Sequence, residues 1–120
     1  MSSQNAKLFV TRKAEADLSA KQYTIVTKGT QPGNILSATP TDYPIGILQD
    51  KPRLNEVGTI AIDGIAKVVA GGTVTELAYC GADAQGRGVV ATTGVAVGVF
   101  LDPGVLGDVV RIDLRFTKLS

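Results

Sequence analysis

The sequence predicts a single all-β domain, and three observations carry this prediction. Fourteen glycines and five prolines divide the 120 residues into short segments. Valine, isoleucine and threonine, which favour β-strands, are frequent in those segments. The segments recur about every ten residues, a spacing typical of barrels and sandwiches rather than of βαβ units.

Nine segments have the composition of strands. They cover residues 22–28, 34–39, 45–48, 59–63, 66–70, 76–80, 88–92, 95–101 and 108–115. In the first of them, alternation places Tyr23, Ile25 and Thr27 on one face, as in a half-buried strand. Helix formers gather only in residues 12–21, where we expect one short helix or a turn.

An internal duplication is the most informative pattern. Residues 45–62 align without a gap to residues 97–114, and five positions are identical, among them Gly46 with Gly98 and Asp50 with Asp102. Each copy has the pattern strand, turn, strand. The shared glycine indicates a bulge or a close approach of two backbones. The duplication therefore predicts a pseudo-symmetric β unit, which describes architecture rather than catalysis.

Between the two copies, turn residues predict a hairpin. Asp83 and Gly86 are the residue types of a tight turn, which would join residues 76–80 to residues 88–92. A calcium loop needs several carboxylates at alternate positions, and this turn has only one.

The composition excludes several kinds of active site. The chain has no histidine, which rules out imidazole bases, histidine-containing metal sites and Ser-His-Asp or Cys-His catalysis within one chain. Cys80 is the single cysteine, and it has neither a disulfide partner nor a neighbouring cation to activate it. Asp50 and Asp102 begin matching turns, where a carboxylate binds backbone N–H groups. We expect no catalytic, cofactor-binding or metal-binding residues.

The distribution of charge suggests an arm on a body. Twelve basic and eleven acidic residues give no electrostatic signal for nucleic acid. Residues 1–28 nevertheless carry a net charge of +3, and residues 29–120 a net charge of −2. We expect an N-terminal arm over residues 1–15 and a β domain over residues 16–120. The arm would reach a neighbouring subunit or another protein, or would be a solvated terminus without a partner.

Neither a signal peptide nor a membrane span is expected. Residues 1–13 lack an apolar signal region. The longest uncharged apolar stretch, residues 88–101, is 14 residues long and too short to span a bilayer.

Five phrases, taken in order, resemble the small capsid decoration, or cement, proteins of tailed bacteriophages and prophages. They are ADLSAKQYTIVTK, YPIGILQDKP, VGTIAIDGIAKVVAGG, GADAQGRGVVA and VGVFLDPGVLGDVVRIDL, and they span residues 16–114. The resemblance lies in their order and spacing, since each phrase alone is an ordinary strand and turn. Asn55, where the family often has glycine, and the segment ELAYC depart from the family pattern.

The resemblance implies a compact β-barrel or β-tulip body without enzymatic activity or cofactor. It also implies a trimer that binds the major capsid protein at three-fold and quasi-three-fold positions outside the head. There the protein would stabilise the head against the internal pressure of the DNA, without contacting nucleic acid or membrane. It would be made in the host cytoplasm and carried on the exterior of the virion.

Contacts to the capsid or to a neighbouring subunit are expected from the arm. Its apolar strand with basic flanks suits addition to an exposed sheet edge. The residues concerned are Lys7, Leu8, Phe9, Val10 and Arg12.

Two other kinds of protein share parts of this pattern. A biotinyl or lipoyl carrier domain is also a small, duplicated β-barrel, but it needs a lysine at an exposed hairpin tip, where this chain has Ala84 and Gln85. A trimeric nucleotide hydrolase with a β core would need converging carboxylates, phosphate-binding groups and usually a metal.

Overall fold

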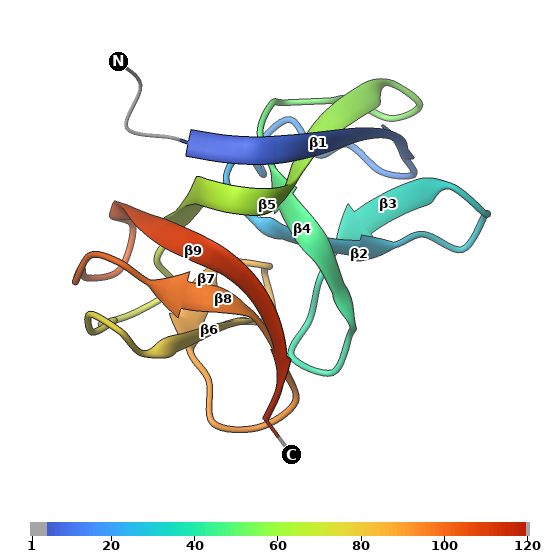
Figure 1. Ribbon diagram of the computed structural model, residues 1–120. Helices are drawn as coiled ribbons and strands as arrows, with labels where there is room; N and C mark the ends of the chain where they lie inside the picture. Colours follow the sequence, from blue (N-terminus) through green and yellow to red (C-terminus); the bar gives the residue numbers. More distant parts are fainter. Residues whose placement is uncertain (1–4, 120) are drawn as a thin grey trace.

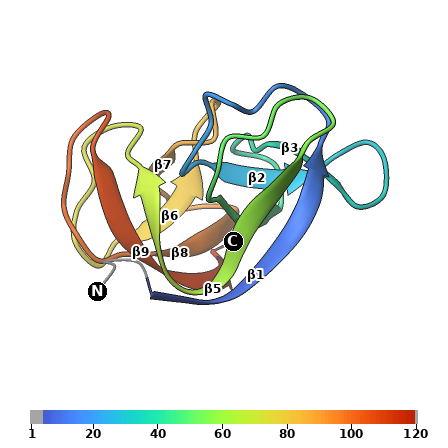
Figure 2. The same cartoon turned by 90° about the horizontal axis from the view of Figure 1, so that it is seen from above.

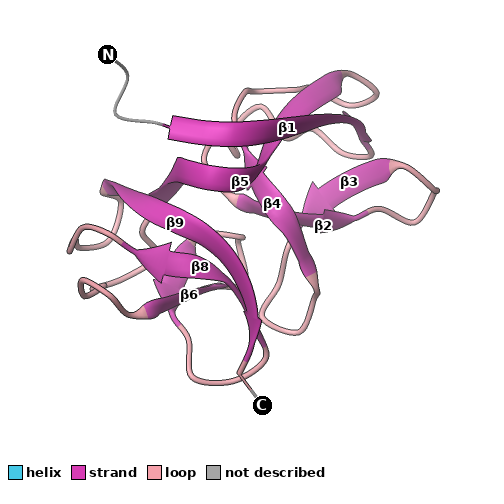
Figure 3. Cartoon of the chain, viewed as in Figure 1, coloured by secondary structure: helices cyan, strands magenta, loops and turns pink. Residues whose placement is uncertain are grey.

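The computed structural model describes residues 5–119, and side chains from Phe9 onward. Within this range all regular elements are strands, which confirms the predicted all-β class (Figures 1 and 3). The strands are β1 (Asn5–Ala14), β2 (Ile25–Lys28), β3 (Asn34–Ser37), β4 (Pro44–Leu48), β5 (Val57–Val69), β6 (Tyr79–Ala82), β7 (Gly88–Val90), β8 (Val95–Phe100) and β9 (Val109–Lys118).

The first five strands form a closed barrel. Their order in the sheet is β1-β3-β2-β4-β5, and β1 also pairs with β5, which closes the ring. β1 is antiparallel to β5 and parallel to β3. Closure leaves fewer open strand edges than a flat sheet would have.

The remaining strands repeat this arrangement. β5, β9, β8, β6 and β7 follow one another in the sheet, and a parallel bridge between Ala70 and Gly88 connects the end of β5 to β7. The long strand β5 is thus the last strand of the first unit and the first strand of the second. Figure 2 shows the two units side by side, joined through β5.

Strand register confirms the predicted duplication. Leu48 pairs with Ile60 between β4 and β5, and Phe100 pairs with Ile112 between β8 and β9, which is the same register 52 residues later. The equivalence extends beyond the aligned segments. Ala14 at the end of β1 donates its N–H to the carbonyl oxygen of Glu56 at 2.9 Å, and the N–H of Ala70 bonds in the same way to Asp108 at 2.7 Å. The repeat therefore includes the first strand of each unit.

Four local expectations need adjustment. The strand expected from residue 22 begins at Ile25, because Tyr23 has a positive φ of 64° and belongs to the preceding turn. The strands expected at residues 59–63 and 66–70 are one strand, β5, because Gly64 adopts a positive φ of 90° and lets the strand continue. β6 begins at Tyr79 rather than at residue 76, because Leu77 has a positive φ of 68° and belongs to the preceding turn. In residues 12–21 the structure has strand and turns but no helix, so the turn was the right alternative.

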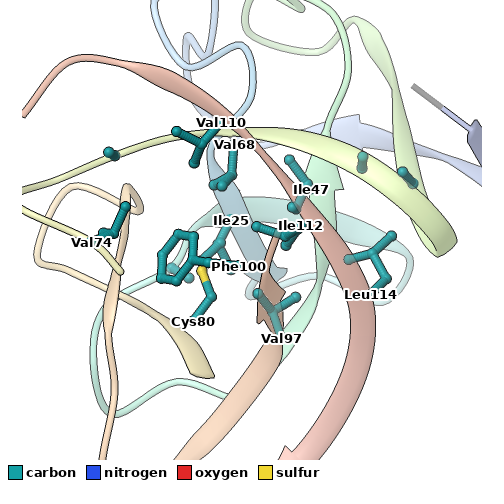
Figure 4. Close-up of a cluster of buried hydrophobic side chains, with 14 residues drawn as sticks. Ile25, Ile47, Val68, Val74, Cys80, Val97, Phe100, Val110, Ile112 and Leu114 are labelled. Carbon is teal, nitrogen blue, oxygen red and sulfur yellow. The ribbon is translucent and has the colours of Figure 1, made fainter. Parts of the chain in front are cut away.

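Two hydrophobic cores fill the fold. The first lies inside the closed barrel and comprises Ala14, Leu18, Val26, Ile35, Leu48 and Ile60. The second core is built around Phe100, whose side chain is fully buried; most of its residues belong to the second unit, and it extends to the first (Figure 4). Ile25 and Ile47 of the first unit belong to the second core, while their neighbours Val26 and Leu48 face the first. Strands β2 and β4 are therefore buried on both faces.

Candidate functional site

The residues predicted to contact a partner lie on β1. The described part of the predicted arm forms this strand, which pairs along one edge with β5 from Asn5 to Lys13. Its other edge pairs with β3 only at Lys13 and Ala14. In the described chain, the backbone from Phe9 to Arg12 therefore has one edge without a neighbouring strand. Such an edge is a template for the addition of another strand.

The side chains of β1 divide between the barrel and the solvent. Phe9 is 44% exposed, a large fraction for an aromatic side chain, and Arg12 is exposed as well. Val10 instead packs against the first core. Phe9 and Arg12 are thus available to a partner, whereas Val10 holds the strand in place. The side chains of Lys7 and Leu8 lie outside the described residues, although the backbone of Leu8 pairs with Asp63.

Glu15, directly after β1, fixes the neighbouring loop. Its carboxylate accepts hydrogen bonds from the N–H of Gln31 at 2.6 Å and from the N–H and hydroxyl of Thr30, both at 2.8 Å. These donors, those of the backbone first, lower the pKa of Glu15 from 4.5 to about 2. The loop between β2 and β3 is thereby held against the end of β1.

Asp50 and Asp102 have the structural role predicted for them. Asp50 accepts the backbone N–H of Thr59 at 3.1 Å, and Asp102 accepts that of Arg111 at the same distance. Each carboxylate fixes the start of a turn to the returning strand. Asp102 also binds the guanidinium group of Arg111, and this side-chain hydrogen bond lowers the pKa of Asp102.

The predicted hairpin between β6 and β7 is present. The carboxylate of Asp83 accepts N–H groups of Gln85 and Arg87 and forms an ion pair with the Arg87 side chain at 2.8 Å. Gly86 has a positive φ of 81°, as the turn requires. Asp83 is thus occupied by its own turn.

Cys80 faces the interior of the second core. The side chain is fully buried, and this burial raises the pKa of its thiol far above the ordinary range. A nucleophile needs access to its substrate and a thiolate form. Cys80 has neither in this conformation. Within the described residues, no cluster of three or more histidine, cysteine or carboxylate side chains is arranged to hold a metal ion.

Two further surface features were not predicted from the sequence. A cavity of about 340 Å³ lies between the two units, with Ile25 and Val97 among its buried lining residues. Its lining comes from segments distant in the chain, so no local pattern marks it. The second feature is a set of exposed apolar side chains at equivalent positions of the β4–β5 and β8–β9 hairpins, namely Leu54, Val57, Leu106 and Val109. The alignment of the two copies pairs Leu54 with Leu106 and Val57 with Val109, so the signal for this feature was present in the sequence.

Comparison with known proteins identifies the fold. No family model and no curated protein matches this sequence. Among solved structures, the N base of the head fiber gp8.5 of bacteriophage phi29 is similar, with a TM-score of 0.73 and 14% sequence identity. The match covers 94% of this chain and 98% of that one. The two chains therefore share the whole β-barrel fold, including both units.

Within residues 5–119, no helix is long and apolar enough to cross a membrane.

Proposed function

We propose that this protein is a structural component of a bacteriophage head and binds its outer surface. The observation that carries the proposal is the likeness over nearly the full chain to the base of a phage head fiber, at a TM-score of 0.73. The order of sequence phrases that resembles phage decoration proteins points independently to the same place. Fold alone does not specify function, and the agreement of these two observations supports the proposal.

In this proposal the protein stabilises the head against the pressure of its DNA. A rigid body suits such a role. The two units share β5 and a common core, so they form one body rather than two hinged modules. The proposed partner is the major capsid protein. The buried thiol of Cys80 is not activated as a nucleophile, so it gives no reason to propose an enzymatic reaction instead.

The free edge of β1 is the proposed contact with the capsid or with a neighbouring subunit. A partner strand would pair with the backbone from Phe9 to Arg12, while the exposed Phe9 ring and Arg12 guanidinium would contact its side chains. Val10 would contribute its backbone only, because its side chain packs inward. Lys7 and Leu8 belong to the same proposed contact.

We also propose that the protein is a trimer at three-fold and quasi-three-fold positions. Three identical contacts on one particle act together, so that individually weak contacts give firm attachment. Sedimentation equilibrium of the purified protein tests this directly, since a trimer has three times the 12.4 kDa mass of the chain. A monomer at all concentrations, and on the particle, would overturn the trimer.

The function is tested by co-sedimentation with purified phage heads that lack this protein. We expect saturable binding to the heads and a higher temperature for their disruption. Two variants examine the β1 contact. Phe9→Ser should weaken binding about tenfold or more. Phe116→Ser, which alters another partly exposed phenylalanine far along the chain, should bind as the unaltered protein does.

The possible results separate the parts of the proposal. Absence of binding together with unchanged head melting would overturn the structural role. Binding that is equally strong with Phe9→Ser would retain the role and remove β1 from the contact. The denaturation midpoint of each variant shows that it is folded before binding is compared.

A further inference from the structure

The cavity between the units lies where a strand ladder stops early. In the first unit, β2 and β4 remain paired up to Thr27 and Pro44. In the second unit, the equivalent strands β6 and β8 are paired only as far as Cys80 and Gly98. The next residues along both strands line the cavity. The cavity therefore begins where the pairing of β6 with β8 ends.

One backbone position at this gap offers hydrogen-bonding groups. The backbone N–H of Asp83 donates to the carbonyl oxygen of Arg87, and that of Ala91 donates to the carbonyl oxygen of Tyr79. Asp83 and Tyr79 are therefore at hydrogen-bonded positions of the β6–β7 hairpin. Because such positions alternate, Ala82 lies at a non-hydrogen-bonded position. Its N–H and carbonyl groups therefore point away from β7, towards the side where the pairing with β8 has ended. Ala82 also lines the cavity.

The lining indicates what kind of group fits. Near β6 the wall consists of small residues. The partly buried Val89 and Val95 add apolar surface, and the lining threonines Thr39, Thr92 and Thr93 add hydroxyl groups. Its two carboxylates are already bound: Asp42 accepts the N–H of Thr39 at 2.9 Å, and Asp83 is paired with an arginine. The described lining contains no basic side chain. The cavity thus has no cation to hold an acidic group, and its mixed wall of valine and threonine suits an uncharged segment.

We propose that this cavity binds an extended, uncharged segment of a partner protein. The segment would hydrogen-bond to the backbone of Ala82 and bury one branched apolar side chain against Val89 and Val95. A peptide suits the site better than a small apolar molecule because it satisfies the outward-pointing backbone groups as well as the apolar wall. A volume of about 340 Å³ holds one or two residues of such a segment. This inference does not depend on the proposed role in a phage head.

Titration of the ¹⁵N-labelled full chain with a short β-forming peptide tests the proposal. The probe is the N-acetylated, C-amidated pentapeptide Thr-Val-Thr-Val-Thr, and its control is the same peptide with glycine in place of valine. We expect saturable changes of amide signals confined to residues around the cavity, Ala82 and Val97 among them. The glycine peptide should bind about tenfold more weakly, because it lacks the apolar side chains.

Two variants connect binding to this site. Ala82→Pro removes the N–H that would bond to the peptide, and Thr93→Trp places a large side chain at the exposed rim of the cavity. Each should weaken binding about tenfold. Thr73→Trp, at an exposed position outside the cavity, is the matched control and should bind normally.

Three results would each overturn the proposal. They are the absence of saturable signal changes, changes confined to β1, and unaltered binding by Thr93→Trp. The last variant decides the matter if Ala82→Pro does not fold, because Thr93 is exposed and its replacement leaves the strands intact.

Discussion

Gly46 and Gly98 occupy the same place in the two halves of the fold. A methyl group on Gly46 would overlap the carbonyl oxygen of Ala61 on the facing strand, and a methyl group on Gly98 would overlap that of Asp113. The backbones of β4 and β5, and likewise those of β8 and β9, approach so closely only because Gly46 and Gly98 have no side chain. The duplication thus preserves a steric requirement as well as a pattern of residues.

Alanine at either glycine should therefore destabilise the protein. We expect Gly46→Ala and Gly98→Ala each to lower the free energy of unfolding by about 1–3 kcal/mol, as overpacking does. Gly72→Ala is the control, because a methyl group there meets no atom within 4 Å. Urea denaturation measures all three. Equal stability of the Gly72 and Gly98 variants would show that the strands separate easily at this point.

The paired turn carboxylates should also behave alike. Removing Asp50 leaves the N–H of Thr59 without its acceptor, and removing Asp102 does the same to Arg111. We expect Asp50→Ala and Asp102→Ala each to cost about 1 kcal/mol in unfolding free energy.

Salt distinguishes the two carboxylate variants. Asp102 additionally binds the partly exposed side chain of Arg111, and salt screens such a surface pair. The cost of Asp102→Ala should therefore fall in 1 M salt, while that of Asp50→Ala stays nearly constant. Denaturation curves at low and high salt provide the measurement. The same salt dependence for both variants would contradict the assigned contacts.

Cys80 provides a test of the second core. Because its thiol is fully buried, a thiol reagent such as dithionitrobenzoate should react only after the core opens. We expect no labelling of the native protein on the timescale of minutes and complete labelling in denaturant. Rapid labelling without denaturant would mean that the core around Cys80 opens readily in the native protein.

The hairpins and the duplication were predictable because their signals are local. Asp83 and Gly86 mark their turn by residue type, and the second copy repeats Gly46 and Asp50 at a constant spacing. Strand alternation placed Ile25 and Thr27 on a buried face, but the predicted half-buried strand was wrong in two respects. Val26 between them is buried as well, and Tyr23 precedes the strand.

The sharing of strands between units was not predictable in the same way. Ile60 faces the first core and its neighbour Ala61 faces the second, so β5 is apolar on both faces. Its sequence therefore lacks the alternation of apolar and polar residues that would show which face is buried. The closure of the barrel by β1 depends on pairings with β5 more than 40 residues away along the chain, as in the pair of Val10 with Ile60. The cavity is formed by segments from both units, and no single stretch of sequence encodes it.

The hydrogen bonds to Glu15 predict a loss of stability in acid. In the folded protein its pKa is about 2, compared with an ordinary value of 4.5, so the unfolded chain binds a proton first as the pH falls. Glu15 therefore contributes its full stabilisation above about pH 5, and the contribution decreases through pH 4.5 towards pH 2.

Glu15→Gln should be less stable than the unaltered protein at pH 6 and should lose less stability between pH 5 and pH 2.5. The control is Glu76→Gln, which makes the same change at an exposed position in the loop before β6 and should be as stable as the unaltered protein at pH 6. Urea denaturation at each pH compares the three proteins, and an equal pH dependence for Glu15→Gln and the unaltered chain would show that the loop at Thr30 is not held by this carboxylate.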